Sequence, residues 1–346
     1  MNFKEFKTKY EKVPTVHYPN NIQNKPFVSI CVQTYQHELY IEKCLDSLIN
    51  QKTNFDYEIL IGEDCSDDST RRICIDYAKR FPEKVRLFLH NRENNIKINE
   101  FHTGRFNVLY NLYSSKGKYI AFCEGDDFWL SPNKLNRQIQ IIKEKKAGAV
   151  LSDFIYQKKN SSKMSKHSKR LKTFSYYKVD SNVMDPKKYH LSHTSTYLFD
   201  RKYLYQLFNH KWLCKSWGLD TLLMPIFFDE GDVYFLREKL TAYRVNHTGI
   251  SSMKEDGSGS IYKHKAIQFS DLKKFHPNYK KMIVFEQSLA FLKYFSRTMD
   301  FSIFRNVLNA ITNLQRLKEY LVLKRELLKL LRTAKCKINA IMNGEF

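Results

Sequence analysis

The sequence predicts an α/β protein built around a mainly parallel sheet. Short apolar runs of strand length alternate with segments whose apolar residues recur at helical spacing. This alternation is typical of βαβ units, in which a helix returns the chain so that successive strands run in parallel. A chain of 346 residues is long enough for one large domain or two modest ones.

Individual elements follow from these patterns. One helix is expected over residues 39–49 and another from Thr70 to Arg80, with Pro82 just beyond its end. Four strands are expected as short apolar runs at 27–32, 57–62, 85–89 and 118–123. Mixed strand and helix patterns return over 193–246, and the chain turns helical after about residue 265.

Composition divides the chain into three parts. The first is polar and lysine-rich, and it predicts either a loose arm or a short leading helix. The central part contains a segment with seven basic residues and no acidic one, which indicates an exposed, mobile insertion. The expected parts are an arm at 1–26, a central domain at 27–255 with halves 27–140 and 141–255 and the insertion at 157–172, and a basic helical region at 256–346.

Charge restricts the class of partner. Hydrophobic residues make up 42% of the chain, so a folded core is expected in place of disorder. The formal net charge of +22 excludes an acidic solvating protein. It favours partners that carry negative charge, among them nucleic acid, nucleotides, anionic lipid and anionic glycan.

Hydropathy and cysteine usage predict a cytoplasmic protein. The mean hydropathy is −0.53, no apolar run reaches the length of a membrane span, and the first residues lack the apolar core of a secretory signal. The seven cysteines are odd in number and never spaced as CxxC. Free thiols in a reducing compartment are therefore expected, and a zinc site is not.

Polar or acidic residues follow three of the predicted strands where each strand ends. They are Thr34 and Tyr35, Glu63 and Asp64, and the run from Glu124 to Asp127. The carboxyl ends of parallel strands meet at one edge of a sheet, so these residues are expected to converge on one crevice. Carboxylates gathered in a basic protein suggest a divalent cation, because Mg²⁺ and Mn²⁺ take oxygen ligands. The alternative for 124–127 is an acidic turn that favours the start of the next helix.

The second acidic turn has a similar ambiguity. Asp68, Ser69 or Thr70 would serve as a cap for the helix that follows. Glu63 and Asp64 come too early for that role. Carboxylates at their position are able to accept hydrogen bonds from the imide of a uracil and from ribose hydroxyls.

These stretches, in this order, resemble the family-two glycosyltransferases, inverting enzymes with the GT-A fold. Four ordered stretches are far more specific than any one of them. Weaker similarity continues further along the chain, so the resemblance covers about residues 27–252. The strong matches lie at 29–35, 40–48, 58–70 and 116–127, and the weaker ones at 193–195, 217–220 and 243–251.

The resemblance implies a nucleotide site at the first two strand ends. Thr34 and Tyr35 occupy positions where the family holds the nucleobase. Asp64 would pair with the base, and Glu63 would approach the ribose.

The resemblance also implies a metal site. Glu124, Gly125 and Asp126 match the family's DxD element, with Glu in place of the first Asp. Glu124 would face the ribose, and Asp126 would bind the Mn²⁺ or Mg²⁺ that bridges the diphosphate. Asp127 would orient Asp126 or a metal-bound water, or join the ligands. His247 lies in the family's closing loop, one position later than the usual metal-binding histidine.

Asp220 aligns with the family's catalytic base, although Leu219 replaces the acid often found before it. An inverting transfer needs a carboxylate to deprotonate the acceptor hydroxyl while that hydroxyl attacks the anomeric carbon. The alternative is a helix cap before Thr221, since Asp is a favoured capping residue.

The function implied is hexosyl or N-acetylhexosaminyl transfer from a nucleotide-sugar, in particular a UDP-sugar. The acceptor would be a glycan or a lipid-linked glycan of a bacterial surface polysaccharide. The basic insertion and tail would hold the enzyme on the inner face of the cytoplasmic membrane. Equally, the tail would pack as a helical appendage or form an oligomer.

Two other classes of function account for parts of the sequence. A nucleic-acid-binding protein would account for the charge, but the sequence contains no recognisable module for that role, so no nucleic acid is expected. A catalytically silent protein on the same fold would bind an anionic glycan. The joint presence of Asp64, Asp126 and Asp220 argues against this alternative.

Overall fold

The computed structural model divides the chain into two compact units. Unit 1 comprises Met1–Asp180 and His190–His247, and unit 2 comprises Ser181–Tyr189 and Thr248–Phe346. Each unit is described by itself. The structure describes residues 1–22, 25–98, 101–158, 161–164, 176–179, 193–216, 218–245, 260–272, 280–316 and 328.

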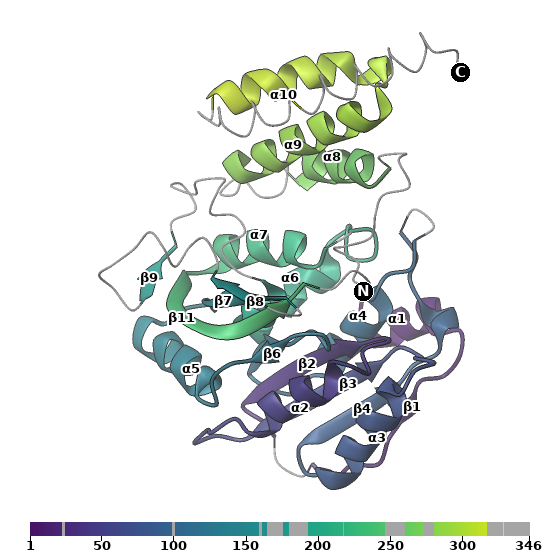
Figure 1. Ribbon diagram of the computed structural model, residues 1–346, viewed down its shortest axis with the longest axis vertical. Coiled ribbons are helices and arrows are strands. Elements are labelled where there is room, and N and C mark those ends of the chain that lie inside the picture. The colour runs from purple at the N-terminus through teal and green to yellow at the C-terminus, as the bar shows by residue number, and fades with distance from the viewer. Residues whose placement is uncertain are drawn as a thin grey trace. The chain divides into compact units, whose positions relative to one another are not determined.

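Unit 1 is built on one sheet, to which the described residues contribute eleven strands (Figure 1). They are β1 (Val16–His17), β2 (Val28–Thr34), β3 (Tyr57–Glu63), β4 (Val85–Leu89), β5 (Tyr119–Phe122), β6 (Phe128–Trp129), β7 (Ala149–Lys158), β8 (Ser161–Met164), β9 (Tyr176–Lys178), β10 (Leu198–Asp200) and β11 (Val233–Arg244). The order is β1-β4-β3-β2-β5-β10-β7-β11-β6, with β8 on β7 and β9 on β11. Strands β4, β3, β2 and β5 are parallel, as are β7 and β11. The predicted fold class is confirmed.

The helices of unit 1 lie between and after these strands. They are α1 (Phe3–Tyr10), α2 (Ile41–Ile49), α3 (Thr70–Arg80), α4 (Arg105–Ser114), α5 (Lys134–Lys145), α6 (Leu204–Asn209) and α7 (Asp220–Glu230). The helix predicted from Thr70 to Arg80 has those bounds in the structure. The four predicted strands correspond to β2, β3, β4 and β5, within one or two residues at each end.

The central strands are buried on both faces. Every residue of β2 and β3 is buried, which explains why these strands read as continuous apolar runs. Two amides of α4 fix the helix against them: Asn107 donates to the Gly62 carbonyl at 2.7 Å, and Asn111 to the Val32 carbonyl at 2.9 Å. Gly62 is needed there, because a Cβ would lie 1.8 Å from the Asn107 Oδ1 atom.

The lysine-rich N-terminus forms ordered structure within unit 1. Asn2 and Glu5 make a reciprocal capping box at the start of α1, and Phe6 is fully buried. Strand β1 pairs with β4, placing Val16 opposite Leu89. The first residues therefore form a helix and a strand, and the loose arm is not what the structure shows.

Part of the basic insertion is also ordered. Strand β8 pairs antiparallel with the end of β7, from Ile155 opposite Met164 to Lys158 opposite Ser161. Residues 161–164 are therefore strand, where an irregular segment was expected. The other residues of the insertion, 159–160 and 165–172, lie outside the described residues.

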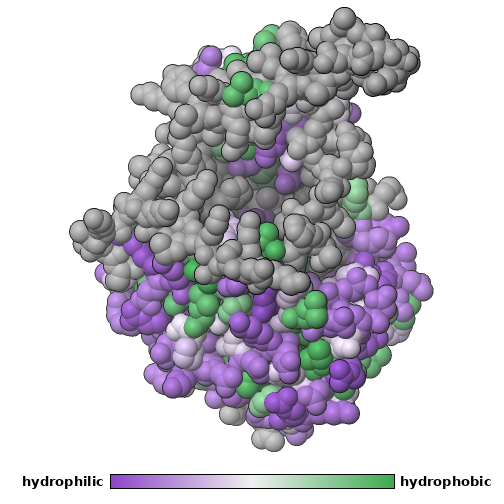
Figure 2. Space-filling model, in the orientation of Figure 1, coloured by the Kyte–Doolittle hydropathy of each residue, from purple (hydrophilic) through white to green (hydrophobic). Residues whose placement is uncertain are grey.

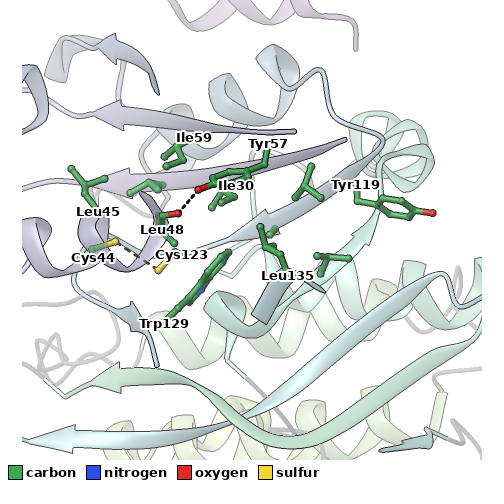
Figure 3. Close-up of a cluster of buried hydrophobic side chains, with 14 of the residues drawn as sticks. Ile30, Cys44, Leu45, Leu48, Tyr57, Ile59, Tyr119, Cys123, Trp129 and Leu135 are labelled. Atoms are coloured by element: carbon green, nitrogen blue, oxygen red, sulfur yellow. Dashed lines mark hydrogen bonds between the residues drawn. The ribbon is translucent and has the colours of Figure 1, made fainter. Parts of the chain in front are cut away.

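The core of unit 1 contains a fully buried lysine. Figure 3 shows the apolar cluster of this unit, which includes Leu48 of α2, Ile30 of β2 and Trp129 of β6. Lys134 is fully buried, and its ammonium lies 4.1 Å from the centroid of the Trp129 ring. The ammonium donates to the Gln138 Oε1 atom at 2.7 Å. Burial lowers the pKa of Lys134 from its usual 10.5 to about 7.

Replacing Lys134 with Met is expected to stabilise the protein by about 1–4 kcal/mol at neutral pH, because the fold then no longer desolvates an ammonium. Between pH 7 and 10.5 the unfolded chain holds this proton and the folded chain does not, so wild-type stability rises with pH. The advantage of K134M should therefore shrink by about 1.4 kcal/mol per pH unit above 7. Urea unfolding, monitored by tryptophan fluorescence at several pH values, measures this difference in the free energy of unfolding.

The matched control for this prediction is Lys145→Met, which removes an exposed lysine from the same helix. The control should leave stability nearly unchanged at every pH. A difference between K134M and wild type that stays constant from pH 7 upward would contradict the assignment.

Unit 2 is helical in its described part. It contains α8 (Ser260–Leu272), α9 (Lys280–Thr298) and α10 (Phe304–Arg316), and α9 packs against both of the others. The buried residues are largely apolar and include Phe269, Leu272, Leu292, Phe295 and Leu314. The leucine-rich stretch 321–331 lies outside the described residues, apart from the exposed Leu328.

Hydrophilic residues cover most of the coloured face in Figure 2. Among the described helices, none combines the length and the apolar character that crossing a membrane requires. The six cysteines in this part of the chain are free thiols.

Candidate functional site

The three predicted strand ends lie side by side in the structure. Strand β2 lies between β3 and β5. The carbonyls of its last two residues each accept a hydrogen bond from the turn that follows one of these neighbours. The Asp64 N–H donates to the Thr34 carbonyl at 3.1 Å, and the Gly125 N–H donates to the Gln33 carbonyl at 2.9 Å. Backbone hydrogen bonds thus join the acidic turn after β3 to the acidic turn after β5.

Asp64 is the centre of the first cluster of side chains. It is 2% exposed and forms an ion pair with Arg92, and the Asn95 amide donates to its Oδ2 atom at 3.2 Å. Its other oxygen, Oδ1, is buried and has no hydrogen-bond partner among the described residues. Burial raises the pKa of Asp64 to about 6, against the opposing effect of Arg92.

Tyr35 belongs to the same cluster. The Arg92 guanidinium lies 4.0 Å from the centroid of the half-buried Tyr35 ring. A cation, an aromatic ring and a carboxylate with an open acceptor therefore meet at one edge of the sheet. This combination is suited to a flat, polar ring such as a nucleobase.

Glu63 has a role inside the protein. It is fully buried, accepts a hydrogen bond from the Ser66 N–H at 2.7 Å, and pairs with Arg71 of α3. Both carboxylate oxygens are engaged, so Glu63 braces the turn after β3. The ribose contact expected for Glu63 stays a prediction.

Gly125 allows the second turn to approach β2 closely. A Cβ at this position would lie 2.7 Å from the Thr34 side chain and 2.8 Å from the His37 ring. Thr34 is buried, and its hydroxyl lies 3.2 Å from the Nδ1 atom of His37. The glycine of the DxD-like element is thus required by packing, whatever ligand the element binds.

Three carboxylates are close together in the turn after β5. Glu124 and Asp126 are half-buried, and Asp127 is fully buried. Burial, and then the charges of Asp126 and Asp127, raises the pKa of Glu124 to about 7, while His193 acts in the opposite direction. A cation bound here would relieve this crowding of negative charge.

Asp127 organises the turn. Its Oδ2 atom accepts from the Ser195 hydroxyl at 2.6 Å and lies 3.1 Å from the His193 Nδ1 atom, and its Oδ1 atom accepts from the Arg244 N–H at 3.0 Å. Although burial lowers the pKa of His193, the charge of Asp127 and its hydrogen bond outweigh burial and raise it. With both oxygens engaged, Asp127 ties the turn to the segment before β10 and to β11.

Arg244 braces the same turn from β11. Its guanidinium donates to the Asp126 carbonyl at 2.9 Å and lies 4.6 Å from the centroid of the Phe128 ring. Beside it in the chain, the Tyr243 ring stacks on the His193 ring with 4.2 Å between centroids. The end of β11 therefore holds the backbone of the carboxylate turn in place.

The carboxylates fit a divalent cation that is shared with a substrate. Among the described residues, no group of three His, Cys, Asp or Glu side chains is arranged to hold a metal alone. Mg²⁺ and its relatives are commonly held by one or two carboxylates together with substrate phosphates, and Asp126 can supply one. Asn246 and His247 lie outside the described residues.

Asp220 is the first residue of α7 and is half-buried. Its Oδ1 atom accepts from the Thr221 N–H at 2.9 Å, and its charge acts on the buried Arg105. No hydrogen bond among the described residues links it to Glu124–Asp127. The N-cap of α7 is Leu219 and no side-chain cap hydrogen bond forms there, so Asp220 lies in the first turn of the helix, where its negative charge favours the helix start.

The sequence model of glycosyl transferase family 2 matches residues 29–208, more than half of the chain. The chain belongs to this family. The matched region begins in β2 and ends in α6, so it includes both acidic turns, His193 and Ser195.

Relatives match over shorter stretches. A Mycobacterium tuberculosis protein of unassigned function is 37% identical over 115 residues, which are 33% of this chain and 31% of that protein. The uncharacterized glycosyltransferase EpsJ of Bacillus subtilis is 36% identical over 103 residues, 30% of this chain and 27% of EpsJ. The putative teichuronic acid biosynthesis glycosyltransferase TuaG of the same species is 28% identical over 121 residues, which are 35% of this chain and 44% of TuaG. The matched region thus spans about a third of the first of these relatives.

Solved structures share the fold. S. aureus TarS 1–349 in complex with UDP-GlcNAc aligns over 92% of both chains, with a TM-score of 0.59 and 16% identity. The mannosyltransferase PcManGT from Pyrobaculum calidifontis, in complex with GDP-Man and Mn²⁺, aligns over 94% of this chain and 91% of its own, with a TM-score of 0.53 and 13% identity. The GT-A-like fold expected of a family 2 member is confirmed.

Four side chains that contact Asp64 or Asp127 were not predicted from the sequence. Arg92 and Asn95 follow β4, whose polar end resembles the three strand ends that were recognised. That polar run was a usable signal. His193 and Ser195 lie in a stretch that resembled the family, but only tertiary contacts assign them to Asp127.

Proposed function

We propose that the protein is an inverting glycosyltransferase that transfers a sugar from a nucleotide-sugar, in particular a UDP-sugar, to a glycan hydroxyl. The observation that carries the proposal is Asp64, a buried carboxylate with an open Oδ1 acceptor beside Arg92 and Tyr35. The carboxylate turn that would hold the diphosphate lies at the same edge of the sheet.

The nucleoside would bind at the first cluster. The imide N–H of uracil would donate to Asp64, and Tyr35 would support the base. Arg92 already fixes the Asp64 carboxylate and the Tyr35 ring, so these groups are positioned before the ligand arrives. Glu63 and Arg71 hold the turn that presents Asp64.

The diphosphate would bind at the turn after β5. Asp126 would hold the cation, Mn²⁺ or Mg²⁺, with Glu124 toward the ribose. When bound, the cation would neutralise charge on the nucleoside diphosphate as it leaves. Asp127, Ser195 and Arg244 would keep the Asp126 backbone in place through the contacts described above.

Asp220 would act as the general base. Its carboxylate would take the proton from the acceptor hydroxyl as that oxygen attacks the anomeric carbon, with inversion. No covalent intermediate is needed in this scheme.

The acceptor would belong to a cell-surface polymer. The name of TuaG refers to teichuronic acid, and another relative is the minor teichoic acid biosynthesis protein GgaB of B. subtilis. TarS is solved with UDP-GlcNAc, which supports a UDP-sugar donor, whereas PcManGT is solved with GDP-Man. Contact of the basic tail and the insertion with an anionic membrane remains part of this proposal.

Calorimetric titration with UDP, GDP and CDP, each with and without Mn²⁺, tests the proposal. Metal-dependent binding of UDP in preference to CDP is expected, because Asp64 offers an acceptor for an imide donor and cytosine has none at that position. Absence of binding to all three nucleotides would refute the transferase assignment.

Donor binding is expected to weaken as the pH falls below about 6. The pKa of Asp64 is raised to about 6, so the carboxylate that accepts the imide proton is itself protonated in acid. Each further pH unit should cost about tenfold in affinity. The probe should be a UDP-sugar, since its diphosphate lacks the terminal monoester ionisation near pH 6 that UDP has.

Asp64→Asn should bind the UDP-sugar about tenfold more weakly at neutral pH and lose this pH dependence. Asp56→Asn, an exposed position just before the same strand, is the control and should behave as wild type. A D64N protein that still loses affinity below pH 6 would show that another group is responsible.

A further inference from the structure

A hollow of about 410 Å³ opens in unit 1 at the opposite edge of the sheet from the carboxylate turn. Lys118 and Tyr119 line it at the amino end of β5, whereas Glu124 follows the carboxyl end of the same strand. Gly148 lines it just before β7. Strand β10 is antiparallel to both β5 and β7, so the amino ends of β5 and β7 share this edge. The hollow is therefore separate from the proposed donor site.

The lining of the hollow is mainly cationic. Its charged residues are four lysines and two acids: Lys118, Lys143, Lys146, Lys202, Asp200 and Glu230. All four lysines are exposed. Among the described residues, no carboxylate forms an ion pair with any of these four ammonium groups. Backbone hydrogen bonds hold two of the lysines together, since the N–H of Arg201, next to Lys202, donates to the Lys118 carbonyl at 2.9 Å.

The two carboxylates of the lining are engaged within the protein. Asp200 accepts a hydrogen bond from the Lys202 N–H at 2.9 Å and caps the turn that follows β10. Glu230 accepts from the Gln206 amide at 2.8 Å. Neither neutralises a lysine of the hollow, so the net charge of the lining remains positive.

Tyr203 adds a hydroxyl without a partner. The side chain lines the hollow and is 1% exposed, and its hydroxyl has no hydrogen bond among the described residues. Two glycines leave room for this hydroxyl. A Cβ on Gly148 would lie 1.5 Å from the hydroxyl oxygen, and a Cβ on Gly231 would lie 2.5 Å from it. Burial raises the pKa of Tyr203 to about 12, so the hydroxyl keeps its proton at neutral pH. A buried donor left unpaired is costly, and a ligand acceptor would satisfy it.

We propose that this hollow is a second ligand site, which binds a phosphate group. A tetrahedral oxyanion offers several acceptor oxygens to ammonium groups that approach from different elements, and lysine binds phosphate as a point charge. The Tyr203 hydroxyl supplies the neutral donor at the floor of the site. The proposal requires no donor nucleotide and no metal.

Titration of the full chain with inorganic phosphate, in EDTA, tests the proposal. Hydrogen exchange should slow in segments 142–148 and 200–203 when phosphate is added, because these segments line the hollow. The double variant K118A/K202A should bind phosphate at least about tenfold more weakly. K52A/K79A removes the same charge from exposed positions elsewhere in unit 1 and should bind as wild type.

Tyr203→Phe provides a second, milder variant. It should keep or raise the melting temperature, because it removes an unsatisfied hydroxyl, and it should weaken phosphate binding several-fold. Equal losses in K118A/K202A and K52A/K79A would overturn the proposal, since binding would then reflect bulk charge. Protection confined to the segment 124–127 would overturn it as well.

Two competitors identify the source of the phosphate. Displacement of inorganic phosphate by glycerol 3-phosphate, and not by phosphatidylglycerol vesicles, would assign the group to a soluble or polymer-borne ester. Displacement by the vesicles would assign it to a lipid headgroup. If neither competitor nor inorganic phosphate itself binds, the proposed phosphate site is wrong. That result would leave the outcome of the UDP titration unaffected.

Discussion

Replacing Asp220 with Asn is expected to abolish sugar transfer while nucleotide binding is preserved. An amide cannot accept the proton of the acceptor hydroxyl, so kcat should fall by about 10²–10⁴-fold. Asn retains the oxygen that accepts the hydrogen bond from the Thr221 N–H. The melting temperature and the affinity for UDP should therefore stay near wild type.

This variant separates the two interpretations of Asp220. If the carboxylate only stabilises the start of α7, D220N should remain active, because the hydrogen bond from the Thr221 N–H survives. Asp229→Asn is the matched control, since it removes a half-buried carboxylate near the other end of the same helix. Loss of nucleotide binding together with activity would show that the assignment of Asp220 as base is wrong.

The parallel half of the sheet was predictable because its signals are local. The strands at 27–32 and 57–62 are buried on both faces, so each reads as a largely apolar run, with Ser29 and Glu58 as the polar exceptions. The helix from Thr70 to Arg80 has its apolar face and its end marked in the sequence. Once these strands are taken as parallel, the convergence of their polar ends follows from topology alone.

The rest of the fold depends on pairings that have no local signal. Strand β10 has three residues and β6 has two, and their positions follow from pairing with β5 and with β11. The N-terminal helix is mostly polar and lysine-rich, and only Phe6 is buried in it. Such elements are ordered by the surface on which they pack. Composition alone therefore left open whether this segment is a loose arm or a short leading helix.

The same distinction separates the predicted site residues from the missed ones. Asp64 and Asp126 follow strands directly, so their position was readable. The internal contact of Glu63 was not, because it depends on Arg71, the second residue of the next helix. Asp127 likewise gained its role from Ser195, which lies 68 residues further along the chain.

Asp126 and Asp127 should respond differently to the same substitution. Asp126→Asn is expected to remove the strengthening of UDP binding by Mn²⁺, a loss of at least about tenfold, because the oxygen that would face the cation loses its charge. Binding in EDTA should be unchanged.

Asp127→Asn is expected to lower the melting temperature, since the amide cannot accept from Ser195, His193 and the Arg244 N–H together. Calorimetry and thermal unfolding of both variants provide the comparison. If D127N loses the metal effect at an unchanged melting temperature and D126N keeps it, the two roles are reversed. The adjacent carboxylates differ in their partners, and so the difference in outcome, more than either loss alone, tests whether the turn after β5 holds a cation.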